Sequence, residues 1–123
     1  MNALQNKLNI ELCNINNDGC LKFSFGEHFN EDDANTAVKE WKDLIGSARG
    51  DKINIIWNCL DMKSYEAKAL TTWQQALKQM KNQIENIWLI TDSKKLKTGA
   101  MLMSAFSELK IKVVKSEEMI CNN

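Results

Sequence analysis

The chain has 123 residues, of which 44% are hydrophobic and 26% charged, so we expect residues 1–123 to form one ordinary globular domain. This composition excludes a disordered chain, and no apolar run approaches the ~20 residues that a membrane-spanning helix needs. Sixteen basic and sixteen acidic side chains cancel, which argues against a general nucleic-acid binder that works by neutralising phosphates.

The two halves of the chain differ in charge. Residues 1–62 contain six basic and ten acidic side chains, a net charge of −4. Residues 63–123 contain ten basic and six acidic side chains, a net charge of +4. We interpret the difference as two solvated faces of unequal composition, and the alternative is a polar surface that docks a partner or a second copy of the chain.

The four cysteines, at positions 13, 20, 59 and 121, form no CxxC pair, and His28 is the only histidine. A zinc site would lack both ligand number and ligand spacing, so we expect no metal and no cofactor. The N-terminal MNALQNKLNIEL lacks the apolar stretch of a signal peptide, which predicts a cytoplasmic protein with reduced thiols. Cys13 and Cys20 can face each other across a hairpin, and we expect the cysteines to be small, buried or half-buried hydrophobic residues.

An antiparallel hairpin is predicted at the start of the chain. Residues 8–14 and 20–25 both alternate between apolar and polar side chains, as strands with one buried face do. The NNDG at 16–19 between them is a turn signal, because asparagine and glycine tolerate positive φ. The apolar residues expected to face the core are Leu8, Ile10, Leu12, Leu21, Phe23 and Phe25.

A first helix is predicted from Asn30 to about Ile45. The Asn30 side chain can cap the free N–H groups, and the three acids after it suit the positive end of the helix macrodipole. One apolar stripe follows, and we place its Trp41 in the core rather than at the surface as an interface anchor. We expect Gly46 to Gly50 to end the helix, and we interpret His28, in the preceding loop, as a solvent-exposed histidine rather than a catalytic base.

Three further strands and two longer helices follow. INIIWN at 53–58 and NIWLIT at 86–91 are almost continuously apolar, which is typical of strands covered on both faces, and 110–115 is a short last strand. A helix is predicted over 65–82, another begins after a cap at Asp92 or Ser93, and Ser116 caps a final helical stub. The side chains expected to point inward from the two longer helices are Ala69, Leu70, Trp73, Leu77, Met80, Leu96, Ala100, Met103 and Phe106 or Ser107. We expect the four tryptophans and six methionines to be core residues rather than a ligand box.

The element order β-β-α-β-α-β-α-β predicts an α/β fold. Crossover helices require the later strands to be parallel, with right-handed connections and helices covering the sheet. The expected result is a mixed sheet with the antiparallel hairpin at one side.

This order, together with the segments WLITDS and IKVVKSEE, resembles the STAS domain, in its SpoIIAA-like branch of anti-sigma-factor antagonists. The resemblance is specific over residues 53–114. It implies a bacterial regulatory or protein-binding module. Phosphorylatable members carry a DLSxVxxxDSSGL stretch between strand and helix, in which a serine at the helix start accepts phosphate.

On this chain that stretch corresponds to NCLDMKSYEAKAL, residues 58–70. Met62, Tyr65 and Leu70 match apolar positions of the family. Glu66 stands in place of the aspartate, while Ala67, Lys68 and Ala69 replace the two serines and the glycine, so the usual phosphorylation switch is missing. The nearest hydroxyls are those of Ser64 and Ser93, each of which we interpret as a helix cap rather than a phosphorylation site.

Candidate binding residues cluster at the carboxyl ends of the predicted parallel strands, where open α/β sheets bind ligands. The candidates for partner or ligand binding are Asp61, Ser64, Tyr65, Glu66, Lys68, Asp92 and Ser93, beside further polar side chains at Asn58, Thr91, Lys94 and Ser116. No glycine-rich phosphate loop is present, and no nucleophile with a base stands out.

The sequence therefore predicts a non-enzymatic module that recognises a protein partner, or itself as a homodimer, through loop 58–68 and the following helix. It predicts no nucleic-acid partner and no transmembrane segment. The alternative function is binding of a small apolar, lipid-like ligand, which the abundance of methionine and tryptophan favours.

Overall fold

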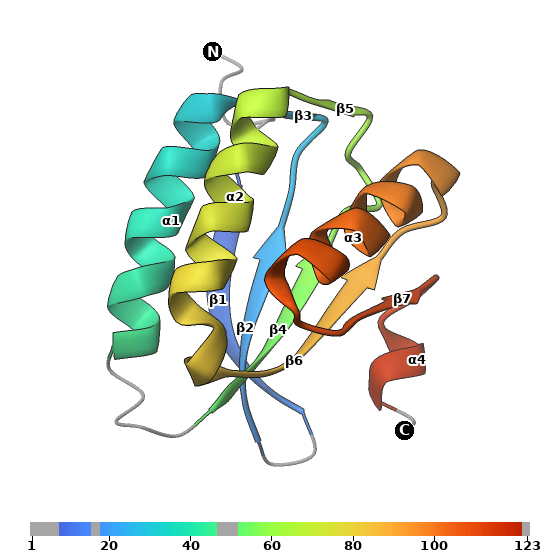
Figure 1. The fold of residues 1–123 in the computed structure, drawn as a ribbon. Coiled ribbons are helices and arrows are strands. Elements are labelled where there is room, and N and C mark those ends of the chain that lie inside the picture. Colours follow the sequence, from blue (N-terminus) through green and yellow to red (C-terminus); the bar gives the residue numbers. More distant parts are fainter. Residues whose placement is uncertain (1–7, 16–17, 47–51, 122–123) are drawn as a thin grey trace.

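The computed structural model of the chain describes residues 8–15, 18–46 and 52–121 (Figure 1). Its elements are β1 (Asn9–Ile15), β2 (Asp18–Ser24), β3 (His28–Phe29), α1 (Glu31–Gly46), β4 (Ile53–Asn58), β5 (Ser64–Tyr65), α2 (Ala67–Met80), a 3-10 turn η2 (Lys81–Gln83), β6 (Ile84–Ile90), α3 (Lys94–Ser107), β7 (Ile111–Val114) and α4 (Glu118–Cys121). Parts of two predicted features, the turn at 16–19 and the helix end at 46–50, lie outside the described residues.

Five strands form one mixed sheet in the order β1-β2-β4-β6-β7. The β1–β2 pair is antiparallel, and the pairs β2–β4, β4–β6 and β6–β7 are parallel. The predicted α/β class is therefore confirmed, with the hairpin at one side of the sheet. Cys13 lies directly opposite Cys20 across the hairpin, as its spacing suggested, and both are free thiols.

Helices α1, α2 and α3 cover one face of the sheet (Figure 1). An aromatic cluster fills the space beneath them, in which the Trp73 ring of α2 lies 5.0 Å from Trp41 of α1 and 5.5 Å from Phe23 of β2. Trp41 is fully buried, so its placement in the core is confirmed. Large aromatic side chains of this kind supply most of the apolar area that holds such a layer together.

The short helix α4 covers part of the opposite face. Its Ile120 is 1% exposed and packs with Cys20, Ile56, Trp88 and Ile90. Before the helix, Glu117 accepts a hydrogen bond from the Lys22 ammonium at 2.6 Å. Strands β4 and β6 therefore have apolar side chains buried on both faces, as their continuous apolar runs predicted.

Three apolar predictions were wrong. Leu12 is 65% exposed because β1 is the edge strand and the hairpin extends past the lower ends of α1 and α2 (Figure 1). Met101 and Met119 are exposed rather than core residues, since each lies on the outer side of its helix.

The pair β3–β5 was also missed. These two-residue strands pair in parallel, joining the chain before α1 to the chain before α2. A two-residue strand has no measurable periodicity, so no pattern could have indicated it.

Candidate functional site

An apolar pocket of about 50 Å³ lies between α2, α3 and the sheet. The pocket is open to solvent. Its walls come from the ends of β2 and β4, from the chain between β4 and α2, and from the two helices. The lining residues are Phe25, Phe29, Trp57, Cys59, Met62, Tyr65, Leu70, Trp73, Leu89, Leu96, Gly99, Ala100 and Met103.

The floor of the pocket lies at the carboxyl ends of parallel strands. Phe25 directly follows β2, and its N–H donates to the carbonyl of Asn58 at 3.0 Å. Cys59 directly follows β4, and its N–H donates to the carbonyl of Ile90 at 2.9 Å. These bonds extend the parallel pairing past the last strand residues, so both side chains are fixed at the edge where α/β sheets commonly bind ligands.

The three apolar positions that match the family stretch all line this pocket. Met62 is held by a turn in which its N–H donates to the carbonyl of Cys59 at 3.1 Å. Tyr65 comes from β5, and Leu70 from the first turns of α2. The apolar residues that match the family stretch in the sequence therefore form part of the pocket wall.

Gly99 leaves a gap in the wall that α3 provides. A Cβ built on Gly99 would meet one atom within 4 Å, the Tyr65 hydroxyl oxygen at 3.8 Å. The Lys95 ammonium lies 5.3 Å from the centre of the Tyr65 ring, a cation–π contact at the rim. Glycine inside a helix costs stability relative to alanine, so the gap is maintained at the expense of α3.

The lining of the pocket has few reactive groups. Among its lining residues in the described part of the chain, the groups that could react are the Tyr65 hydroxyl and the Cys59 thiol. Burial raises the pKa of the Cys59 thiol, which keeps it protonated and makes it a poor nucleophile. The apolar lining is suited to excluding water from an apolar group.

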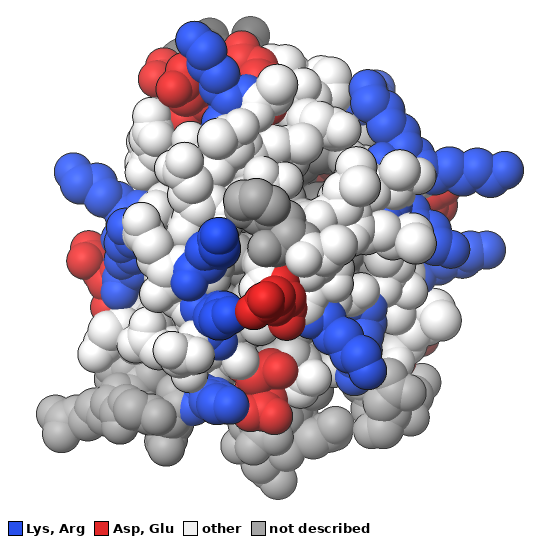
Figure 2. All heavy atoms as spheres, in the orientation of Figure 1, with Lys and Arg blue, Asp and Glu red and all other residues white. Residues whose placement is uncertain are grey.

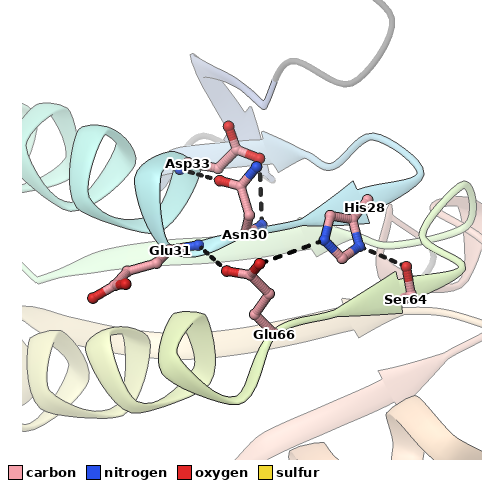
Figure 3. Close-up of polar contacts among 6 residues, drawn as sticks. All are labelled: His28, Asn30, Glu31, Asp33, Ser64 and Glu66. Carbon is pink, nitrogen blue, oxygen red and sulfur yellow. Dashed lines mark hydrogen bonds and ion pairs between the residues drawn. The ribbon is translucent and has the colours of Figure 1, made fainter.

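A polar cluster lies beside the pocket, on β3, β5 and the first residues of α1 (Figure 3). His28 Nδ1 and the Ser64 hydroxyl are hydrogen-bonded at 2.6 Å, and His28 Nε2 lies 3.9 Å from a carboxylate oxygen of Glu66. The other carboxylate oxygen of Glu66 accepts the backbone N–H of Glu31 at 2.8 Å. Glu66 therefore caps α1 from the start of a different helix.

This cluster contains the pairing of a hydroxyl with a histidine that the sequence did not reveal. The two backbone N–H groups at Ser64 and just before it are already engaged. The N–H groups of Lys63 and Ser64 both donate to the carbonyl of Glu27, at 2.8 Å and 3.1 Å. The bonds of Glu66 and Ser64 therefore join the loop before α2 to β3 and to the start of α1.

The structure separates the predicted candidates into two groups. Ser64, Tyr65 and Glu66 lie together at the pocket and the polar cluster, and Asp61 and Lys68 are exposed on either side of them. Asp92 is exposed and Ser93 half-buried on the separate loop before α3.

The two serines differ in role. The Ser93 hydroxyl accepts the N–H of Leu96 at 3.3 Å, so its interpretation as a helix cap is confirmed. Ser64 caps no helix, because it lies in β5 and bonds to His28, while the N-cap of α2 is Glu66 with no side-chain cap bond. The cap predicted at Asn30 is present, since its side-chain oxygen accepts the N–H of Asp33 at 2.8 Å.

Sequence reasoning missed the residues that form the pocket from the core side, above all Phe29, Gly99 and Ala100. Ala100 was expected to point inward, but no pattern in the sequence predicted an opening, because a cavity exists only between side chains from separate elements. Gly99 carried one usable signal, since a glycine within a helical pattern often has a packing or functional reason.

Among the described residues, no group of three or more histidine, cysteine, aspartate or glutamate side chains could hold a metal ion. None of the helices that the structure describes has the length and apolar character required to cross a membrane.

Comparison with known proteins identifies the fold. No protein-family pattern and no curated protein sequence matches the chain. Among solved structures, it is similar to an uncharacterised protein of the DUF3478 family from Shewanella loihica PV-4, described as having a SpoIIAA-like fold. The TM-score is 0.79 at 9% sequence identity, and the match covers 94% of this chain and 92% of the other. The strand order, the three helices on one face and this match together show that the chain has a SpoIIAA-like fold.

Proposed function

We propose that this chain is a non-enzymatic binding module that takes a small apolar group into the pocket between α2 and α3. The observation that carries the proposal is the pocket itself, an apolar opening at the carboxyl edge of β2 and β4. Binding sites for small molecules are commonly concave, mostly apolar and located at this edge of α/β sheets.

The size of the pocket limits the ligand. A dry engineered cavity of about 150 Å³ holds benzene, so a pocket of about 50 Å³ accommodates a narrower group. The end of an alkyl chain fits this description, with the remainder of the ligand outside the pocket. We therefore infer an amphiphile with a linear apolar tail.

Filling the gap at Gly99 tests this function. Gly99→Leu places a side chain in the pocket at a position where a Cβ meets the Tyr65 hydroxyl at an ordinary contact distance. The substitution also improves helix propensity, by about 0.8 kcal/mol on host–guest scales, so the variant is expected to fold. Gly46→Leu, at the end of α1 where a Cβ meets nothing within 4 Å, is the matched control.

Thermal unfolding in the presence of decanoate is the measurement. Decanoate should raise the Tm of the native chain and of Gly46→Leu but not that of Gly99→Leu. A ligand present at one hundred times its Kd stabilises the fold by about 2.7 kcal/mol, which such a measurement resolves. If Gly99→Leu is poorly folded, Gly99→Ala should show weakened binding. An equal response of the native chain and Gly99→Leu, or no response of the native chain, would overturn the proposal.

A second candidate function is protein recognition by a regulatory module, as the sequence resemblance implies. Leu60, in the turn after β4, is 47% exposed, and its chain neighbour Asp61 is exposed as well. An exposed leucine next to a charged residue is suited to a transient protein contact. Bacterial origin, a cytoplasmic location and phosphorylation at Ser64 or Ser93 stay predictions that go with this candidate.

Two variants separate the candidates. If the chain recognises a protein, a tagged chain purified from its native cell should co-purify with a stoichiometric protein partner. Leu60→Asp should then lose that partner, while Gly99→Leu should keep it. Intact-mass analysis of the same material tests the serines, and an unmodified mass would remove the phosphorylation hypothesis.

A further inference from the structure

The outer side of α3 combines exposed apolar and basic side chains. Met101 is 63% exposed and Leu102 is 66% exposed, side by side in the middle of the helix. Lys94, Lys95 and Lys97 are exposed in its first turn. We refer to these five residues as the α3 outer face.

Helical spacing places most of the outer face away from the pocket, with Lys95 at its edge beside Tyr65. At 100° per residue, Lys94, Met101 and Leu102 fall on the side of the helix away from Ala100 and Met103, which are buried against the core. In Figure 2, lysine side chains project at the right of the molecule, where α3 begins in Figure 1. One helix therefore provides a pocket wall on its inner side and an amphipathic surface on its outer side.

The positions of the three lysines are electrostatically unfavourable for α3. The sequence of α3, KKLKTGAMLMSAFS, contains no acid, and its three lysines lie at the positive end of the macrodipole. Asp92, just before the helix, offsets one charge and leaves a net charge of +2 over residues 92–107. Cations in the first turn weaken a helix. The cation–π contact with Tyr65 compensates Lys95, whereas the electrostatics of the helix do not account for Lys94 and Lys97.

The stability of the fold does not explain the exposed apolar side chains of α3 either. Met101 and Leu102 gain nothing from solvent, and α3 has other exposed positions, such as Thr98, that carry polar residues. Apolar side chains beside lysines are typical of helices that lie in the interface of an anionic bilayer. The lysines would contact lipid phosphates while the apolar side chains enter the boundary of the acyl chains.

We propose that the α3 outer face docks on the surface of an anionic lipid bilayer. The contact is peripheral and reversible, because two apolar side chains and three lysines give a modest affinity. Its role rests on the proposed function: the docked helix would hold the pocket, which opens on its other side, near a source of amphiphiles with alkyl tails. A symmetric contact between two copies through this face is disfavoured, since it would bring six lysines together.

Vesicle sedimentation tests the docking. The native chain should sediment with vesicles of phosphatidylcholine mixed with phosphatidylglycerol and not with vesicles of phosphatidylcholine alone, and added salt should weaken the binding. Met101→Ser with Leu102→Ser should weaken it by about tenfold or more, from the loss of two buried apolar side chains. Lys94→Glu with Lys97→Glu should abolish it.

Matched substitutions elsewhere are the controls. Leu12→Ser with Leu60→Ser removes two exposed apolar side chains outside α3, and Lys39→Glu with Lys42→Glu reverses two exposed charges on α1. Both controls should bind vesicles like the native chain. All these positions are exposed, so each variant is expected to fold, and its Tm reports whether it has.

The outcomes separate docking from ligand binding. The α3 outer-face variants should keep the Tm response to decanoate and lose vesicle binding. Gly99→Leu should keep vesicle binding and lose the Tm response to decanoate. Absence of vesicle binding by the native chain, or unchanged binding by the outer-face variants, would overturn the docking and leave the pocket untouched. An oligomer of the native chain that the outer-face variants dissociate would also overturn it, since the face would then join protein copies.

Discussion

Glu66 shows how one side chain can connect two helices. It occupies the N-cap position of α2, yet its carboxylate accepts the N–H of Glu31 at the start of α1 and lies near His28. A carboxylate at a helix start satisfies an otherwise unpaired donor and meets the positive end of the macrodipole. The loop that forms one side of the pocket is therefore fastened to a helix it does not belong to.

Glu66→Ala is expected to lower the free energy of unfolding by about 1 kcal/mol, the usual value for loss of a helix cap. Glu66→Gln keeps an acceptor oxygen and should lose less. Urea denaturation measures both. Lys68→Ala, at an exposed position of the same segment, is the control and should change stability little. A Glu66→Ala variant as stable as the native chain would show that water replaces the carboxylate at no cost.

Glu108 has a backbone conformation that suits glycine. Its φ is 65°, in the left-handed region, where it ends α3 with its N–H donating to the carbonyl of Ser104 at 2.9 Å. Its carboxylate also accepts a hydrogen bond from Lys81 at 2.7 Å, which lowers the pKa of that carboxyl. The two effects need separate substitutions, since one concerns the backbone and the other the side chain.

Both Glu108→Gly and Glu108→Ala remove the ion pair, so their difference isolates the backbone. We expect Glu108→Gly to be more stable than Glu108→Ala by about 1 kcal/mol, because a Cβ is disfavoured at left-handed φ. Ala105→Gly, inside the same helix, should have the opposite sign and cost about 1 kcal/mol. Equal urea midpoints for the two Glu108 variants would contradict the assigned conformation.

At the scale of elements, α4 has an effect larger than its four residues suggest. Strand residues Cys20, Ile56, Trp88 and Ile90 form an apolar surface on the side of the sheet that the three long helices leave open. Ile120 is the buried residue of α4 that packs on this surface. The short helix therefore closes the second face of the fold.

Ile120→Ala is expected to destabilise the fold by about 2–4 kcal/mol, as large-to-small substitutions at buried sites do. Glu118→Ala, at an exposed position of the same helix, should stay within about 0.5 kcal/mol of the native chain. Chemical denaturation of both variants provides the comparison. A small effect of Ile120→Ala would mean that the second face tolerates water.

Elements with a clear period were predictable from the sequence. The apolar runs of β4 and β6 and the stripes of α1, α2 and α3 appear in the structure within a few residues of the expected bounds. Caps at Asn30 and Ser93 were also found, because capping depends on local residue type. Each of these features is decided by neighbours along the chain.

Features that depend on distant residues were not predictable in the same way. The bond between His28 and Ser64 requires the pairing of β3 with β5, which are 36 residues apart and too short to show a pattern. The pocket depends on how α2, α3 and the strand ends leave space between them, and no residue type encodes a gap. The resemblance to STAS domains nevertheless identified Met62, Tyr65 and Leu70 as matching apolar positions, and all three line the pocket.

At the scale of the whole molecule, the sheet belongs to two apolar clusters at once. Trp41, Trp57 and Trp73 lie in the cluster under the long helices, and Trp88 lies in the cluster under α4. Alternate residues of the same strands serve both faces: Ile55 and Trp57 belong to one cluster and Ile56 to the other. Loss of either cluster therefore removes support from strands that the other needs.

We expect the two clusters to unfold together in one transition. Tryptophan fluorescence of the native chain follows all four indoles, whereas that of Trp88→Phe follows only the three of the larger cluster. For each protein, the urea midpoint from fluorescence should coincide with the midpoint from far-ultraviolet circular dichroism, as two-state unfolding requires. If the fluorescence of the native chain changes at lower urea than its circular dichroism, and Trp88→Phe lacks that early change, the second face opens before the rest. Such a result would make α4 a separately unfolding segment, because the parallel strands would then keep their pairing with only one face covered.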